Sequence, residues 1–157
     1  MGDSGLHAFG GVLQHHQFSD VGRLDRVHGG DPLQDGEFER FGAPETVIFH
    51  CFSGDAAMAR ECVDRGYVLS FSGTVTFTNA TELQEAARLV PDGQLLVETD
   101  APYLTPHPYR GTPNESYCVP YTARYLADLR GVAPEELAAA TTATADRVFG
   151  ATFAGAK

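Results

Sequence analysis

The sequence predicts an α/β protein with a parallel sheet. Three runs rich in β-branched and aromatic residues, at 46–50, 67–72 and 95–99, have the character of buried strands. Each run is followed, directly or after a loop, by apolar residues at helical spacing. Strand and helix therefore alternate along the chain, which is typical of a parallel sheet with right-handed crossover connections.

The first two predicted helices lie between these strands. One covers residues 55–65 and ends at Gly66. The other begins near Asn79 and Glu82, whose spacing is that of a capping box. A turn at residues 91–93 then leads into the last strand. The predicted inward-facing residues are Met58, Ala59, Cys62 and Val63 in the first helix and Leu83, Ala86, Ala87 and Val90 in the second.

A proline-rich loop at residues 101–119 follows the last strand, and two more helices complete the pattern. Pro120 suits the first turn of one helix, which ends at Gly131. Pro134 opens the other helix, which ends at Gly150. Their predicted inward-facing residues are Leu126, Leu129, Leu137, Thr141, Ala145 and Val148.

Residues 1–43 have a different composition. More than half of the 17 glycines precede Ala43, and the apolar residues there follow neither strand nor helix spacing. We expect an irregular N-terminal segment, disordered or poorly packed, with at most a weak helix at residues 18–27. The predicted organisation is this segment, a folded part at 44–150 and a tail at 151–157.

Composition limits the classes of function. A chain of 157 residues, 43% apolar and 20% charged, suits a single globular domain. No apolar stretch approaches the roughly 18 residues of a membrane span, and the start lacks a signal peptide. We therefore expect a cytoplasmic protein with no membrane and no obligate protein partner. The net charge of -10 argues against non-catalytic DNA binding, but not against a DNA substrate held through bound cations.

The three cysteines are not spaced as metal-finger ligands. We expect Cys51, Cys62 and Cys118 to be reduced, as small core residues in a reducing compartment. Cys51 follows His50 in the chain, but neighbouring strand residues face opposite sides of a sheet. A Cys–His nucleophile is therefore not favoured.

Two of the predicted strands end in residues that bind metals well. His50 ends the first run, and Asp100 follows the third, where Glu98 shares its face. Two neighbouring buried carboxylates repel, so they need a cation or strong donors nearby. A divalent ion would supply that charge and would lower the pKa of a bound water. The alternative is structural: His50 hydrogen-bonds at its strand end, and Asp100 caps the turn before Pro102.

Four stretches of sequence carry a resemblance to a known family. They are FHCFSG at 49–54, LSFSG with VTFTNA at 69–80, ETDAPYL at 98–104 and RGTPNE at 110–115. In this order and at these gaps they closely resemble the TatD family of metal-dependent hydrolases, which cleave DNA, often from a 3′ end. The resemblance runs from about residue 42 to residue 150.

The resemblance implies an incomplete (β/α)8 barrel of the TIM type, with the three strands as its sixth, seventh and eighth. His50 and Asp100 would be ligands of a divalent ion (magnesium, manganese or zinc). Asp100 would also be catalytic, by helping to activate the attacking water. Glu98 would orient the metal ligands without binding the ion itself. Arg110, Asn114 and Glu115 would form the loop wall beside the substrate.

The loop residues also have structural interpretations. Arg110 either contacts a substrate phosphate or pairs with Glu115, and we favour the pairing. Tyr103 is expected to pack, with its hydroxyl toward the site. His107 lies between two prolines and is expected to be exposed.

The resemblance covers roughly the C-terminal two-fifths of a family barrel. Further ligands expected from the first, fourth and fifth strands are not found in the sequence, and a full barrel needs about 250 residues. We therefore expect a truncated hydrolase that is weakly active or inactive. One alternative is a non-catalytic barrel fragment that is inert or pairs with a complementary half. A hydrolase of esters or amides is a third, which the ETDAPY run at 98–103 disfavours.

Overall fold

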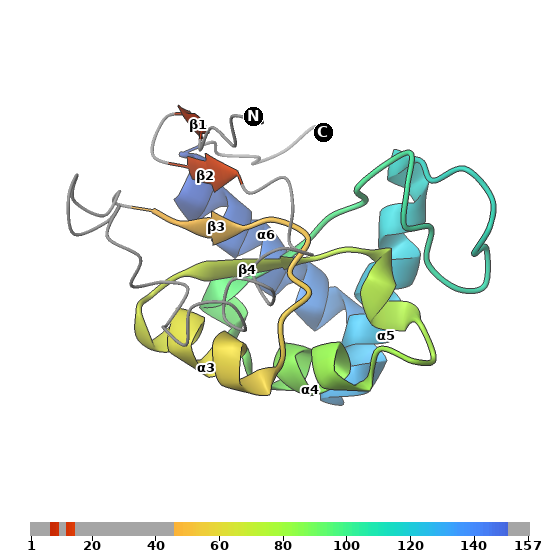
Figure 1. Cartoon of the computed structure of the whole chain (residues 1–157), viewed down its shortest axis with the longest axis horizontal. Helices are drawn as coiled ribbons and strands as arrows, with labels where there is room; N and C mark the ends of the chain where they lie inside the picture. The colour runs from red at the N-terminus through yellow and green to blue at the C-terminus, as the bar shows by residue number, and fades with distance from the viewer. Residues whose placement is uncertain (1–6, 10–11, 15–45, 151–157) are drawn as a thin grey trace, which may run out of the picture.

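The centre of the molecule is a three-stranded parallel sheet. The computed structural model describes residues 7–9, 12–14 and 46–150. The strands β3 (Ile48–Phe49), β4 (Val68–Phe71) and β5 (Leu95–Val97) lie in the order β3-β4-β5, with both pairs parallel. Figure 1 shows β3 beside β4. The prediction of an α/β protein with a parallel sheet is confirmed.

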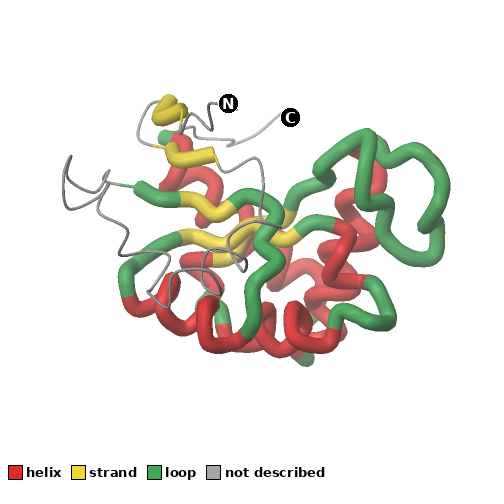
Figure 2. The backbone as a smooth tube through the Cα atoms, viewed as in Figure 1, coloured by secondary structure: helices red, strands yellow, loops and turns green. Residues whose placement is uncertain are grey.

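Helices follow the strands as the sequence predicts, and a long loop joins β5 to α5 (Figure 2). The helix α3 begins after Asp55, whose side chain accepts a hydrogen bond from the Met58 N–H, as an N-cap does. Gly131 ends α5 in a left-handed conformation. The α-helices are α3 (Ala56–Asp64), α4 (Thr81–Leu89), α5 (Val119–Arg130) and α6 (Pro134–Phe149), and the 3-10 helices are η1 (Gly73–Thr76), η2 (Asp92–Gln94) and η3 (Ser116–Cys118).

The predicted capping box at the start of α4 is wrong. The N-cap is Ala80, which makes no side-chain hydrogen bond, and Asn79 lies outside the helix. A tertiary contact connects this region instead: Gln84 of α4 donates from Nε2 to the carbonyl oxygens of Val75 and Phe77 at 3.1 and 2.9 Å. The start of α4 is thus tied to the segment around η1.

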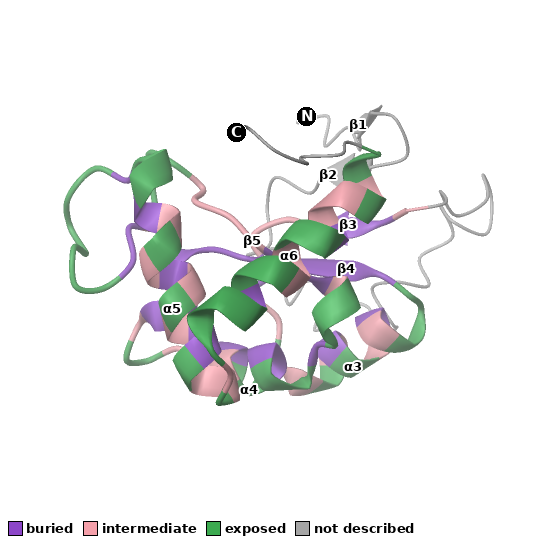
Figure 3. Cartoon of the chain, turned by 180° about the vertical axis from the view of Figure 1, so that it is seen from behind, coloured by how far each residue is buried: buried purple, intermediate pink, exposed green. Residues whose placement is uncertain are grey.

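The two faces of the sheet pack against different helices. Alternate strand residues (Val47, Phe49, Leu69, Phe71 and Leu95) join α3, α4, α5 and the start of α6 in the main core. Ile48, Val68 and Leu96 point the other way and pack against Ala145 and Val148 of α6. Accordingly, α6 crosses behind β3 and β4 in Figure 1 and in front of them in Figure 3, where β3 and β4 are coloured as buried.

A short antiparallel pair lies near the start of the chain. The strands β1 (His7–Phe9) and β2 (Val12–Gln14) pair within the segment that we expected to be irregular. The weak helix considered at residues 18–27 and the tail at 151–157 lie outside the described residues. Across the described part of the chain, no helix has the length and apolar character of a membrane span.

Candidate metal centre

His50, Glu98 and Asp100 meet at the carboxyl ends of the strands. His50 Nδ1 donates to Glu98 Oε2 at 2.8 Å, and His50 Nε2 lies 3.2 Å from Asp100 Oδ1. One ligand atom from each residue lies within 4.8 Å of the other two. The structure therefore brings together the three residues that the sequence singled out, and their atoms are close enough to share one ion.

His50 and Glu98 reach each other across the central strand. They follow Ile48 and Leu96 by two residues, so they lie on the same sheet face as the small core cluster. The strands β3 and β5 are separated by β4, hence by about 10 Å. The β4 residue on this face is Ser70, whose short side chain leaves room for the contact.

Asp100 does not reach the centre as a residue of an extended strand, which is what strand alternation predicts. β5 ends at Val97, and Asp100 has a φ of 59°, in the left-handed region. Cys51, just after His50, has a φ of 50°. Both chain segments thus turn sharply where they leave the sheet, and such conformations cluster at functional sites.

The hydrogen bonds favour a common centre over separate structural caps. The side chain that closes the turn near Asp100 is Thr99, whose Oγ1 accepts from the Ala101 N–H at 3.2 Å. Among the described residues, the side-chain partner of Asp100 is His50. The sequence reasoning missed Thr99, although Ser and Thr often bond their own backbone two residues on.

The two carboxylates beside His50 leave an excess of negative charge at the centre. The hydrogen bond to Glu98 is the main reason that the pKa of His50 is raised; burial opposes it, and the charges of Glu98 and Asp100 add to it. Glu98 Oε1 is buried and has no hydrogen-bond partner among the described residues. A buried carboxylate oxygen without a donor, beside a second carboxylate, suits a bound cation. The donor set of one imidazole and two carboxylates fits a divalent ion such as zinc or manganese.

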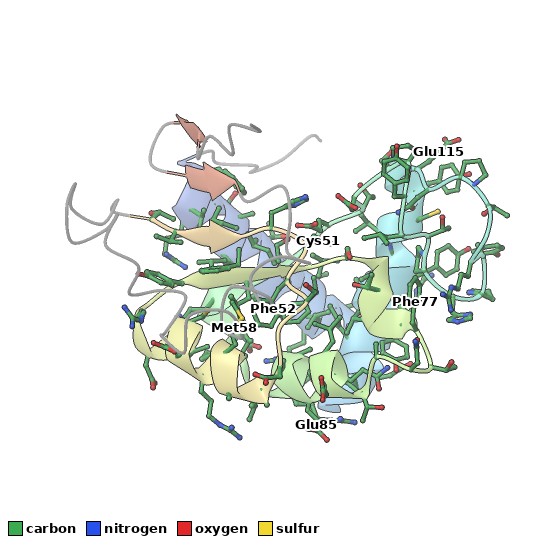
Figure 4. All side chains as sticks on the ribbon, viewed as in Figure 1. Cys51, Phe52, Met58, Phe77, Glu85 and Glu115 are labelled. Carbon is green, nitrogen blue, oxygen red and sulfur yellow. The ribbon has the colours of Figure 1, made fainter. Side chains whose placement is uncertain are left out.

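Arg110 and Glu115 are apart. The Arg110 guanidinium stacks 4.1 Å from the centre of the Phe77 ring, and among the described residues it forms no ion pair with Glu115. Figure 4 shows Phe77 beside η1 and Glu115 well away from it on the same side of the molecule. The Arg110–Glu115 pairing that we favoured is replaced by a cation–π contact.

Of the other loop residues, Tyr103 and Asn114 differ in exposure from what the sequence suggested, and His107 agrees with it. Tyr103 is 70% exposed, so the expectation that it packs is wrong. His107 is exposed as expected; its ring contacts Phe77 edge to face, and its N–H donates to Thr76 Oγ1 at 2.9 Å. Asn114, expected on the loop wall, is buried beneath the loop.

The Cys51 thiol is expected to react slowly with iodoacetamide in the folded protein. Burial is the main reason that its pKa is raised to about 11; a hydrogen bond with Ser72 opposes this, and the charges of Asp100 and Glu98 add to it. Because the thiolate is the nucleophile, alkylation near neutral pH should be about 100-fold slower than for a free cysteine, and should accelerate as the pH approaches 11.

Mass spectrometry of the native protein at several pH values would measure this rate, with Cys51→Ser identifying the modified position. Rapid labelling of Cys51 near neutral pH would contradict the raised pKa. It would also reopen the Cys–His nucleophile that the sequence disfavours.

The fold and the site define a parallel α/β protein whose strands carry a candidate divalent-metal centre at their carboxyl ends. A family model described as TatD related DNase matches residues 36–150, most of the chain. The chain belongs to the TatD family.

Its relatives carry names that refer to metal-dependent or nuclease activity. An uncharacterized metal-dependent hydrolase TatD of Mycobacterium tuberculosis is 65% identical over 109 residues, which are 69% of this chain and 41% of that protein. The uncharacterized metal-dependent hydrolase YabD of Bacillus subtilis is 48% identical over 65% of this chain and 40% of its own length. The 3'-5' ssDNA/RNA exonuclease TatD of Citrobacter rodentium is 38% identical over 70% of this chain and 44% of its own length.

Solved structures support the same fold. The TatD homologue YJJV of Escherichia coli aligns with a TM-score of 0.71 and 25% identity, over 90% of this chain and 50% of that one. The chain thus spans about two-fifths of the length of the curated relatives that it matches.

Proposed function

We propose that this chain carries part of the active centre of a metal-dependent hydrolase that cleaves phosphodiester bonds in DNA. His50 and Asp100 bind a divalent ion, and Glu98 orients His50. The observation that carries the proposal is the convergence of these three side chains, together with the buried Glu98 Oε1, which has no hydrogen-bond partner among the described residues.

Each residue of the centre has a separate role in the proposed reaction. Glu98 Oε2 accepts a hydrogen bond from the His50 Nδ1–H, which leaves Nε2, on the side of Asp100, as the ligand atom. Asp100 offers one carboxylate oxygen as a ligand and the other to take the proton of an attacking water. A divalent ion held there would act as a Lewis acid and would lower the pKa of that water.

DNA is the proposed substrate for two reasons. One relative is named an exonuclease of single-stranded DNA and RNA. In addition, the loop after Asp100 exposes the rings of Tyr103, Tyr109 and Tyr117, at 70, 46 and 65%. Exposed aromatic rings are suited to stacking with unpaired bases, and an arginine in the same loop is suited to phosphate.

We further propose that β3, β4 and β5 correspond to the sixth, seventh and eighth strands of a (β/α)8 barrel. Residues 44–150 would form this part, preceded by a separate segment at 1–43 and followed by a tail at 151–157. Hydrolytic metal sites usually need three or more protein ligands. With His50 and Asp100 as its proposed direct ligands, the described centre should hold an ion weakly and support little activity.

The second candidate is a barrel fragment that is not catalytic by itself. Within the described part of the chain, β5 pairs only with β4, so its other edge is available to a further strand. The chain could therefore associate with a complementary part of a barrel. That association would add strands and the missing ligands.

A nuclease assay separates the two candidates. The purified chain is incubated with magnesium, manganese or zinc and single-stranded DNA, alone and with the N-terminal part of the M. tuberculosis relative. We expect weak metal-dependent cleavage by the chain alone, lost in His50→Ala and Asp100→Ala and retained in Asp128→Asn, an exposed control on α5.

Absence of cleavage by the chain alone, followed by activity when the complementary part is added, would favour the second candidate. Cleavage that persists in both His50→Ala and Asp100→Ala would overturn the proposed centre.

A further inference from the structure

Asp100 has a left-handed backbone conformation, which is uncommon for residues other than glycine, although aspartate and asparagine adopt it more often than most. Its left-handed φ costs on the order of 1–3 kcal/mol unless the surroundings hold it. The carboxylate reaches His50 from a residue that has already left β5, so the contact depends on the shape of this turn. Contacts from outside the turn must therefore help to maintain it.

Asn114 supplies such contacts from further along the loop. Its Nδ2 donates to the carbonyl oxygens of Thr99 and Tyr103 at 2.7 and 2.6 Å. One side chain thus joins the residue before Asp100 to a residue after it. The Asn114 backbone N–H also donates to the Pro102 carbonyl at 3.0 Å. The residue is only 2% exposed, so water does not compete for these bonds.

The orientation of the Asn114 amide follows from its neighbours. Its Oδ1 is buried and has no hydrogen-bond partner in the described structure, which costs about 1–3 kcal/mol. The reverse orientation would set this oxygen against the carbonyl oxygens of Thr99 and Tyr103 and would lose both bonds. The amide is therefore placed for its two donors.

Other hydrogen bonds close the turn only locally. The Tyr103 N–H donates to the Asp100 carbonyl at 3.0 Å, and the Ala101 N–H donates to Thr99 Oγ1 at 3.2 Å. Each joins residues within 99–103. The bonds from Asn114 instead tie this turn to the segment that enters α5.

We propose that Asn114 is a positioning residue for Asp100. By bracketing the turn, it holds the Asp100 carboxylate in the place where it meets His50 Nε2. The effect on metal binding rests on the proposed function, because it requires Asp100 to be a ligand. Asn114 itself touches neither the ion nor the substrate in this assignment.

The chain offers a matched control. Gln94 also donates from one side-chain amide to two backbone carbonyls, those of Val63 and Tyr67, at 3.1 and 2.7 Å. These bonds lie at the opposite, amino-terminal end of β4 and β5. Asn114→Ala therefore removes two amide hydrogen bonds near the metal centre. Gln94→Ala removes two equivalent bonds away from the metal centre. Asn114→Ser keeps a single, shorter donor.

Two measurements test the role in the same variants. Amide hydrogen exchange reports on the Tyr103 N–H, and calorimetric titration with Mn²⁺ reports on the centre. We expect Asn114→Ala to accelerate Tyr103 exchange about tenfold or more and to raise the Mn²⁺ dissociation constant about 10–100-fold. Asn114→Ser should lie between wild type and Asn114→Ala. Gln94→Ala should lower the urea midpoint similarly, without changing either quantity.

Unchanged Tyr103 exchange or unchanged Mn²⁺ affinity in a folded Asn114 variant would overturn the inference, as would equal losses in Gln94→Ala. If Asn114→Ala does not fold, the Tyr103 exchange and the Mn²⁺ affinity of Asn114→Ser decide between the two outcomes. Failure of the wild-type chain to bind Mn²⁺ through His50 and Asp100 would count against the proposed function. Faster Tyr103 exchange in the Asn114 variants would then still support their hold on the turn.

Discussion

Asp100→Asn is expected to weaken binding of Mn²⁺ or Zn²⁺ about 100-fold, which corresponds to about 2.7 kcal/mol. The substitution removes the charge but keeps the shape, and asparagine tolerates the left-handed conformation that Asp100 adopts. The loss should therefore reflect the ligand and not a collapsed turn. Calorimetric titration measures it, with Asp128→Asn as the control for a lost exposed charge.

The same titration should show a definite pH dependence. His50 must lose its proton to bind an ion, and Glu98 and Asp100 raise its pKa. Metal affinity should therefore fall as the pH is lowered through this raised pKa. Asp100→Asn removes one of the charges that raise the pKa, so it should move that loss to lower pH. Affinity that is independent of pH, or equal in both proteins, would exclude His50 and Asp100 as joint ligands.

The stability of the metal-free protein should depend on pH in the opposite sense to metal affinity. The raised pKa of His50 means that the folded state holds this proton more tightly than the unfolded state. The contribution is fully present below the ordinary histidine pKa of about 6.5. It is lost as the pH rises through the higher pKa of the folded protein. Urea unfolding of the metal-free chain across this range measures it.

Gly73→Ala is expected to destabilise the fold by about 3 kcal/mol, the upper part of the usual range for overpacking. A β-carbon at this position would lie 2.0 Å from the Leu104 carbonyl oxygen and 2.8 Å from the Pro106 nitrogen. Both are backbone atoms, so the clash cannot be relieved by rotating a side chain. The loop that follows Asp100 would have to move away from η1.

That movement should also weaken metal binding, because Leu104 lies four residues after Asp100. The control is Gly93→Ala, where a β-carbon meets no atom within 4 Å. Urea unfolding should show a large loss for Gly73→Ala and a change of about 0.5 kcal/mol or less for Gly93→Ala. Equal stability of the two variants would show that the loop does not rest on Gly73 as closely as the structure indicates.

Elements with strong local signals were predicted well. Apolar spacing identified α3 and its stop at Gly66, because chain reversal acts within a few residues. The predicted range included Asp55, which is the N-cap that precedes the helix. The buried face of α4 followed from the same periodicity. The face of α5 was predicted in part: Leu126 is buried as expected, but Thr122 and Ala127, also buried, were not predicted. The stripe of α6 was predicted less completely: Thr144, not predicted, is buried and donates to the Asp92 carbonyl at 2.8 Å.

Strand ends were harder to predict. The predicted strands at 46–50 and 95–99 continue past the last ladder residues, Phe49 and Val97. Residue type does not show where pairing stops, because that depends on the neighbouring strand and on the turn that follows. The capping box at Asn79 failed for a similar reason, since the contacts of Gln84 with η1 connect that region.

The sequence by itself determined the order of strands and helices, the apolar faces and the choice of His50, Glu98 and Asp100, because these depend on spacing and residue chemistry along the chain. Only the tertiary structure decided that Asp100 turns out of its strand to meet His50, that Arg110 stacks on Phe77, and that Asn114 is buried beneath the loop. Those contacts join residues 11 to 50 positions apart, and packing, not local preference, selects among their possible partners.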